Sequence, residues 1–198
     1  QNEYFDVLGE LTQEFTMWEI TYYHRMPSHA AMLEWYRATG MRPYLDKLNK
    51  VPGLEWIRIM YAYPERITDE FIAAMKRNEK VVPYLDLPIQ HSNDTILKNM
   101  NRRSNRAELL EVIGKLRREI PGITLRTTLI AGFPGETEED FVKTLELVRK
   151  VGYMQLFTFI YSKRTGTKAA DMPDPTPRKE KTDRMTRLLK VQDDIAMA

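Results

Sequence analysis

The 198-residue sequence contains no cysteine. Disulfides, cysteine nucleophiles and zinc or iron–sulfur sites held by cysteine are therefore excluded within this chain. It also lacks any apolar run approaching the roughly 20 residues that cross a bilayer, so no transmembrane helix is predicted. Because the first residues show no basic segment followed by an apolar stretch, we expect no secretory signal, no membrane partner and a cytoplasmic location.

An excess of charge of either sign is missing as well. Thirty Lys and Arg side chains face 28 Asp and Glu side chains, which gives a formal charge of +2 and demands neither a nucleic-acid nor a membrane partner. The sequence has no Gly-Lys-Thr phosphate-binding loop and no nucleophile elbow with a Ser-His-Asp order. Nucleoside-triphosphatase and conventional hydrolase functions therefore receive little support.

What the chain does have, from Leu54 onward, is an alternation of short apolar runs with longer amphipathic stretches. This alternation predicts an α/β fold with a parallel sheet. We expect strands at 56–61, 84–89, 123–131 and 156–161, and helices that begin near Thr68, Ser92, Arg106, Thr137 and Lys179. Segments 5–8, 30–36 and 44–48 suggest a strand and two helices, whereas 15–35 has no clean period.

One strand-to-helix junction carries two glycines around a proline, Gly132-Phe133-Pro134-Gly135, followed by Glu136 and an acidic helix start. Glycines at such a junction permit a tight turn and the close approach of a ligand to the backbone, beside unpaired helix N–H groups. An ordinary turn between a strand and a helix explains the pattern equally, and for the bare pattern it is the favoured hypothesis.

A second junction gathers an amide, an imidazole and a hydroxyl in Gln90-His91-Ser92. These residues follow a predicted strand, and ligand sites of parallel sheets lie at the carboxyl ends of the strands. Taken alone, Ser92 or Asn93 is better explained as a helix N-cap, and His91 as a surface loop residue.

Two loops are basic, 98–106 and 161–167. For the first, we favour a solvated turn over a nucleic-acid patch. For the second, a solvated exit loop and contact with an anionic group both remain open.

Taken together, blocks 56–64, 84–92, 125–137 and 159–162 with Gly166-Thr167 resemble radical S-adenosylmethionine (SAM) methylthiotransferases in order and spacing. Arg126-Thr127-Thr128 and Gln90-His91 favour the RimO branch, which modifies an aspartate of a small-subunit ribosomal protein, over the branch that modifies a tRNA adenosine. The resemblance implies that the four strands are the third to sixth of a partial (β/α) barrel of the TIM-like radical SAM type. It covers 54–170, with 1–53 as a divergent N-terminal segment and 171–198 as a linker and C-terminal helix.

In the family, SAM lies across the carboxyl ends of the strands. The resemblance therefore implies cofactor contacts for seven positions of this chain: Gln90, Ser92, Arg126, Gly132, Glu136, Phe159 and Tyr161. It places Gln90 and Ser92 near the ribose or methionine, Gly132 and Glu136 near the adenine, and Arg126 inside the barrel facing a carboxylate.

The family's three cluster cysteines are the main departure, because this chain has none. We therefore expect a fragment or derivative that is inactive alone, holds no [4Fe–4S] cluster and binds SAM weakly. A ribosomal protein of the small subunit is the partner that the resemblance implies. The alternatives are a non-catalytic α/β scaffold, which could self-associate through its open sheet edges, and the related tRNA-adenosine enzyme.

Overall fold

The computed structural model describes residues 42–197, and the sequence predictions for 1–41 lie outside these residues. Within this range the strands are β1 (Ile57–Ile59), β2 (Val81–Asp86), β3 (Thr124–Ala131) and β4 (Gln155–Ile160). The α-helices are α3 (Arg42–Leu48), α4 (Asp69–Arg77), α5 (Asp94–Asn99), α6 (Arg106–Glu119), α7 (Glu138–Val151) and α8 (Arg178–Ala196). Two 3₁₀ turns, η1 (Pro64–Arg66) and η2 (Lys168–Asp171), follow β1 and β4.

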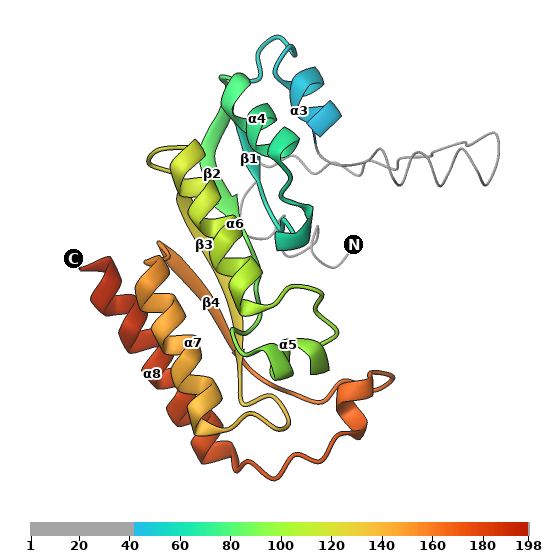
Figure 1. Ribbon diagram of the computed structural model, residues 1–198, viewed down its shortest axis with the longest axis vertical. Coiled ribbons are helices and arrows are strands. Elements are labelled where there is room, and N and C mark those ends of the chain that lie inside the picture. The colour runs from blue at the N-terminus through green and yellow to red at the C-terminus, as the bar shows by residue number, and fades with distance from the viewer. Residues whose placement is uncertain (1–41, 198) are drawn as a thin grey trace, which may run out of the picture. The chain divides into compact units, whose positions relative to one another are not determined.

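The four strands form one sheet in the order β1-β2-β3-β4, and every neighbouring pair is parallel (Figure 1). This confirms the predicted α/β class and the predicted strand order. Because all strands run the same way, their carboxyl ends meet at one edge of the sheet. Any site built at that edge draws on loops that lie far apart in the sequence.

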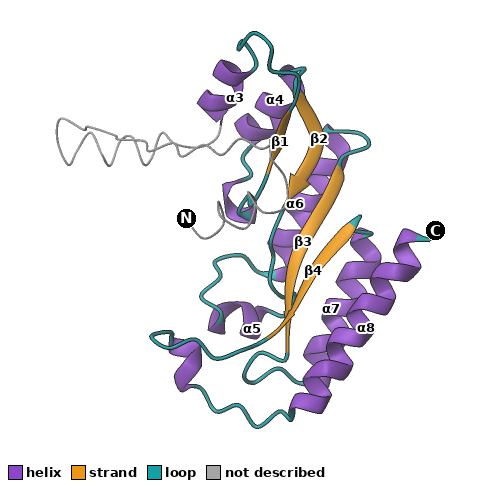
Figure 2. Cartoon of the chain, turned by 180° about the vertical axis from the view of Figure 1, so that it is seen from behind, coloured by secondary structure: helices purple, strands orange, loops and turns teal. Residues whose placement is uncertain are grey.

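Helices α4, α6, α7 and α8 lie on one face of the sheet, and the opposite face is open to view in Figure 2. Alternate side chains of β3 explain this division, because successive strand residues point to opposite faces. Leu125, Leu129 and Ala131 are buried in the core beneath the helices. Arg126, Thr128 and Ile130 face the other way.

Helices α4 to α7 begin near the predicted positions, because side-chain caps satisfy their first N–H groups. Thr68 caps α4, Asn93 caps α5, and Asn105 and Thr137 form capping boxes at α6 and α7. The cap cluster expected at 92–94 is thus resolved in favour of Asn93 rather than Ser92.

Strand β2 begins three residues earlier than predicted and ends at Asp86 instead of Ile89. Pro83 lies where the register between β1 and β2 is irregular, a position that tolerates the missing N–H of proline. Pro88 likewise interrupts the ladder with β3. The strand resumes only as an isolated bridge between Gln90 and Leu129.

Helix α8 packs against β4 and α7 through a stripe that includes Leu188 and Val191. Its buried stripe also contains two cations, Lys181 and Arg184. No helix among residues 42–197 is long and apolar enough to cross a membrane.

Two adjacent leucines of α8 provide a test of this packing. Leu188 is 1% exposed and Leu189 is 41% exposed. We expect Leu188→Ala to lower the free energy of unfolding by about 2–5 kcal/mol, because it leaves a cavity against the sheet. Leu189→Ala should change it by less than about 1 kcal/mol. Urea denaturation of both variants measures the difference, and equal effects would show that α8 is not docked as described.

Candidate functional site

Two adjoining pockets occupy the open face of the sheet near the carboxyl ends of the strands. Their volumes are about 470 and 780 Å³. Gln90, Arg102, Thr128 and Phe159 line both pockets, so we describe the two together as the trough. A ligand of cofactor size fits such a volume.

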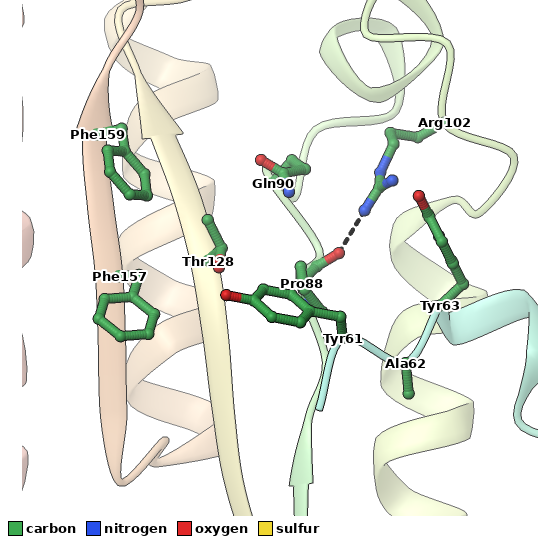
Figure 3. A pocket seen from close by; sticks show the side chains of 9 residues that line it. All are labelled: Tyr61, Ala62, Tyr63, Pro88, Gln90, Arg102, Thr128, Phe157 and Phe159. Carbon is green, nitrogen blue, oxygen red and sulfur yellow. Dashed lines mark hydrogen bonds between the residues drawn. The ribbon is translucent and has the colours of Figure 1, made fainter. Parts of the chain in front are cut away.

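Aromatic side chains form the walls of the smaller pocket. Phe157 and Phe159 project from β4, and Tyr61 and Tyr63 lie across from them after β1 (Figure 3). Pro88, Gln90 and Thr128 lie between the two walls. Flat apolar surfaces with a few polar groups between them favour a planar, partly apolar ligand over a fully hydrated ion.

The larger pocket is cationic. Arg102, Arg164 and Lys168 line it, and its lining contains no acidic residue. Arg102 donates to the carbonyl of Pro88, and its guanidinium lies 5.2 Å from the centre of the Tyr63 ring. The arrangement attracts anionic groups such as a carboxylate or phosphate.

Three residues of the trough, Tyr61, Gln90 and Asn101, have positive φ values that are uncommon without glycine. Tyr61 has φ +56° and Gln90 has φ +71°. The N–H of Gln90 donates to Thr128 and its carbonyl accepts from Ile130, both at 2.9 Å, so β3 holds the residue on both sides. This conformation leaves Gln90 in the trough while the next residue, His91, is buried on the helix side.

A buried ion pair lies under the smaller pocket. Arg126 Nη2 is 2.7 Å from Asp86 Oδ2, and the two residues are 6% and 0% exposed. The guanidinium lies 4.1 Å from the centre of the Phe157 ring, and Asp86 Oδ2 also accepts from the Tyr61 N–H at 3.3 Å. The hydrogen bond with Asp86 raises the pKa of Arg126. The pair therefore links the two aromatic walls.

The predicted position of Arg126 at the carboxyl edge is wrong. Arg126 pairs with Asp86, whereas Gln90 pairs with Leu129, three residues or about 10 Å further along β3. The Arg126 side chain does lie on the open face of the sheet, which corresponds to the predicted interior of the barrel. Asp86, however, already neutralises its charge. Because neighbouring strands decide this pairing, the local sequence around Arg126 does not show it.

The seven residues that the resemblance singled out separate into groups. Gln90, Phe159 and Tyr161 line the trough. Ser92, Gly132 and Glu136 line neither pocket, because they are buried on the helix side. Ser92 pairs with Thr144 at 3.1 Å and accepts from Arg106 at 2.9 Å.

Gly132 and Gly135 have φ values of +70° and +85°, which confirms the predicted tight turn. The sequence also predicted the close approach of a ligand at Gly132, whereas the side chain of Lys181 from α8 occupies the space beside it. A Cβ atom at position 132 would overlap this side chain.

Tyr161 closes the far end of the larger pocket. Its hydroxyl donates to the Ala169 carbonyl at 2.8 Å, and its ring meets Phe133 edge-on with 5.1 Å between centres. Burial and the nearby Asp174 raise the pKa of Tyr161. The hydroxyl therefore stays protonated at neutral pH and keeps its hydrogen bond to the Ala169 carbonyl.

Several functional residues were not singled out from the sequence. His91 is 1% exposed, so its interpretation as a surface loop residue is wrong. Arg102 belongs to the loop interpreted as a solvated turn, yet it lines both pockets. Tyr61 and Thr128 lie inside the blocks that carried the resemblance, and their positions directly after β1 and within β3 are the signal that could have identified them.

Metal ligation has no support in this part of the chain. Residues 42–197 contain no group of three or more His, Cys, Asp or Glu side chains placed to hold an ion. The full sequence contains no cysteine. The trough therefore provides no thiolates for an iron–sulfur cluster.

Comparison with known proteins identifies a family. The model of the radical SAM superfamily matches residues 14–148. The ribosomal protein uS12 methylthiotransferase RimO of Lachnoclostridium phytofermentans is 52% identical over 152 residues, which cover 77% of this chain and 34% of that protein. RimO of Geobacter sulfurreducens is 48% identical over 155 residues, with 78% and 35% covered. The predicted resemblance to methylthiotransferases is confirmed.

The other branch of these enzymes is represented too. The tRNA-2-methylthio-N(6)-dimethylallyladenosine synthase of Thermoanaerobacter sp. is 48% identical over 153 residues, with 77% and 32% covered. Among solved structures, coproporphyrinogen III oxidase (HemN) from Escherichia coli gives a TM-score of 0.63 at 19% identity, and it supports the fold alone. That match covers 78% of this chain and 37% of HemN. The chain spans about a third of the length of the curated relatives it matches.

The ion pair under the trough can be tested by removing one partner. We expect Arg126→Leu to lower the free energy of unfolding by about 3 kcal/mol, because it leaves the buried Asp86 carboxylate without its cation. The double variant Asp86→Leu/Arg126→Leu should be more stable than Arg126→Leu. Lys76→Leu, which breaks an exposed ion pair with Glu119, is the control and should have little effect. Chemical denaturation measures all three, and a double variant less stable than Arg126→Leu would contradict the coupling.

Proposed function

We propose, from the premise that this chain belongs to the radical SAM superfamily, that residues 54–170 are the later half of a methylthiotransferase barrel acting on ribosomal protein uS12. The observation that carries the proposal is the trough. It lies near the carboxyl ends of four parallel strands, in a chain about half identical to such enzymes. Ligand sites of parallel α/β barrels lie at this end.

The residues of the trough suit SAM, which supplies the methyl group and, on reductive cleavage, a 5′-deoxyadenosyl radical. Phe157, Phe159 and Tyr61 offer flat faces to an adenine. Gln90 and Thr128 offer hydrogen bonds, and the cations of the larger pocket suit a carboxylate. Of the residues carried over by resemblance, we keep Gln90, Phe159 and Tyr161 as ligand contacts. We assign Ser92, Arg126, Gly132 and Glu136 to the support of the trough.

The residues present do not fit the superfamily's [4Fe–4S] cluster. Cluster iron is held by thiolates, and these 198 residues contain none. No step of the radical chemistry can therefore be assigned to this chain alone. Its own residues bind and orient the organic ligand, and any cluster ligands come from outside these residues.

The choice of substrate rests on the relatives. Those at 52% and 48% identity are named for uS12, and this favours the ribosomal protein. The tRNA enzyme is the second candidate, because its 48% identity is equally high. For the whole protein we further propose a cytoplasmic location and the boundaries 1–53, 54–170 and 171–198. We also propose self-association through the sheet edges when the chain stands alone.

A chimera tests the proposed activity. The segment of the L. phytofermentans relative that matches this chain is replaced by residues 54–197, so that the host supplies everything outside them. After anaerobic reconstitution, we expect the chimera to methylthiolate uS12 and not tRNA, as measured by mass spectrometry. Modification of tRNA instead would move the assignment to the other branch. No modification of either, from a folded chimera, would favour the scaffold hypothesis.

The isolated chain provides the complementary measurement. We expect no iron–sulfur absorption and no 5′-deoxyadenosine after incubation with iron, sulfide and reductant, because thiolates are missing. Weak binding of SAM should persist by calorimetry. Phe159→Ala should weaken it about tenfold, because it removes an exposed aromatic face worth roughly 1 kcal/mol or more. Val142→Ala, on the outer side of α7, is the control.

A further inference from the structure

Three ionisable side chains from separate elements meet on the helix side of the sheet, behind the trough. His91 comes from the loop after β2, Glu136 from the turn between β3 and α7, and Arg184 from α8. Their side chains are only 1%, 1% and 2% exposed. At this depth each polar group needs a partner in the protein.

The Glu136 carboxylate is the centre of this cluster. Its Oε1 accepts from His91 Nε2 at 2.9 Å, and its Oε2 accepts from the Gly132 N–H at 2.7 Å and from Arg184 Nη1 at 2.6 Å. His91 Nδ1 accepts from the Asn93 N–H at 2.9 Å, so the ring proton lies on Nε2, facing Glu136. Donors therefore surround both carboxylate oxygens.

Each loop that the carboxylate holds continues directly into the trough. Gln90 precedes His91 and lines both pockets. Phe133 follows Gly132, lines the larger pocket and meets the Tyr161 ring. One carboxylate thus sets the positions of two loop ends that form the ligand surface.

Helix α8 reaches the same place a second time through Lys181. Its alkyl chain fills the space beside Gly132, and its ammonium lies 2.5 Å from Asp174 and 5.5 Å from the centre of the Tyr161 ring. Two cations almost one turn apart on α8 therefore support the trough from behind. No residue of α8 lines either pocket.

We propose that Arg184, Glu136 and His91 are positioning residues of the trough. Through them, the C-terminal helix α8 holds Gln90 and Phe133 in the geometry that binds ligand. The inference rests on the proposed function in one respect, that the ligand is SAM. It goes beyond that function by making affinity for SAM depend on a helix that does not touch it.

The test compares two arginines of α8. Arg184→Gln removes the buried cation. Arg187→Gln removes a more exposed cation, whose ion pair with Glu138 has side chains 37% and 48% exposed, while Glu138 keeps Arg184 Nε at 3.7 Å. With the 198-residue chain well below its unfolding temperature, we expect Arg184→Gln to weaken SAM binding about tenfold or more, since small misplacements of binding groups carry costs of this size. Arg187→Gln should change the affinity less than about twofold. Arg184→Lys, which keeps the charge, should recover part of the affinity.

A double variant separates positioning from stability. In Glu136→Gln/Arg184→Gln no unpaired charge is buried, so its unfolding midpoint should be at or above that of Arg184→Gln. The affinity for SAM should stay low. The amide NH2 of Gln at position 136 is itself a donor, so it cannot accept a hydrogen bond from one of the two groups, His91 Nε2 and the Gly132 N–H, that donate to the carboxylate. If midpoint and affinity recovered together, the network would be structural only and the proposal would be overturned.

Amide hydrogen exchange, measured without ligand, keeps this test independent of the proposed function. Arg184→Gln should increase exchange at Gln90 and Gly132, whose N–H groups donate to Thr128 and Glu136. The Leu87 N–H, which donates to the Arg126 carbonyl away from the cluster, should be unchanged. If wild-type chain binds no SAM yet the exchange pattern changes in this way, the proposed ligand is wrong and the positioning stands. Unchanged exchange at both amides in folded Arg184→Gln would refute the positioning whatever the ligand is.

Discussion

Parallel strand pairing is the constraint on which the rest of this structure depends. Four strands aligned in one direction place their carboxyl ends along one edge, and helices follow each strand back across a single face. That face becomes the core, filled by residues such as Leu85 and Leu129. The other face keeps polar and aromatic side chains, and together with the loops at the edge it forms the trough.

The trough is supported by two buried electrostatic arrangements on opposite sides of the sheet. On the open face, Asp86 and Arg126 connect Tyr61 with Phe157. On the helix face, Glu136 connects the loops of Gln90 and Phe133 to Arg184. Buried charges are costly unless they are paired with good geometry, so both arrangements favour one conformation of the loops over others.

The positions of the predicted site residues show how far sequence patterns reach. Resemblance to the family singled out Gln90, Phe159 and Tyr161, and the structure places all three in the lining of the trough. The same reasoning gave no means of separating Gln90 from Ser92, although they are two residues apart. The left-handed conformation of Gln90 turns the chain at this point, and contacts with Thr128 and Ile130 on another strand hold that conformation.

The sequence by itself determined the α/β class, the order of the strands, the helix starts and the family. The class, the strand order and the helix starts depend on local signals: apolar period, capping residues such as Thr68 and Thr137, and glycines that permit positive φ. The family depends on the resemblance of four sequence blocks in their order and spacing. Only the tertiary structure decided that Asp86 neutralises Arg126, that His91 is buried against Glu136, and that α8 supports the trough through Lys181 and Arg184. The physical reason is that each of these contacts joins residues 40 or more positions apart, and nothing in the neighbourhood of either partner specifies the other.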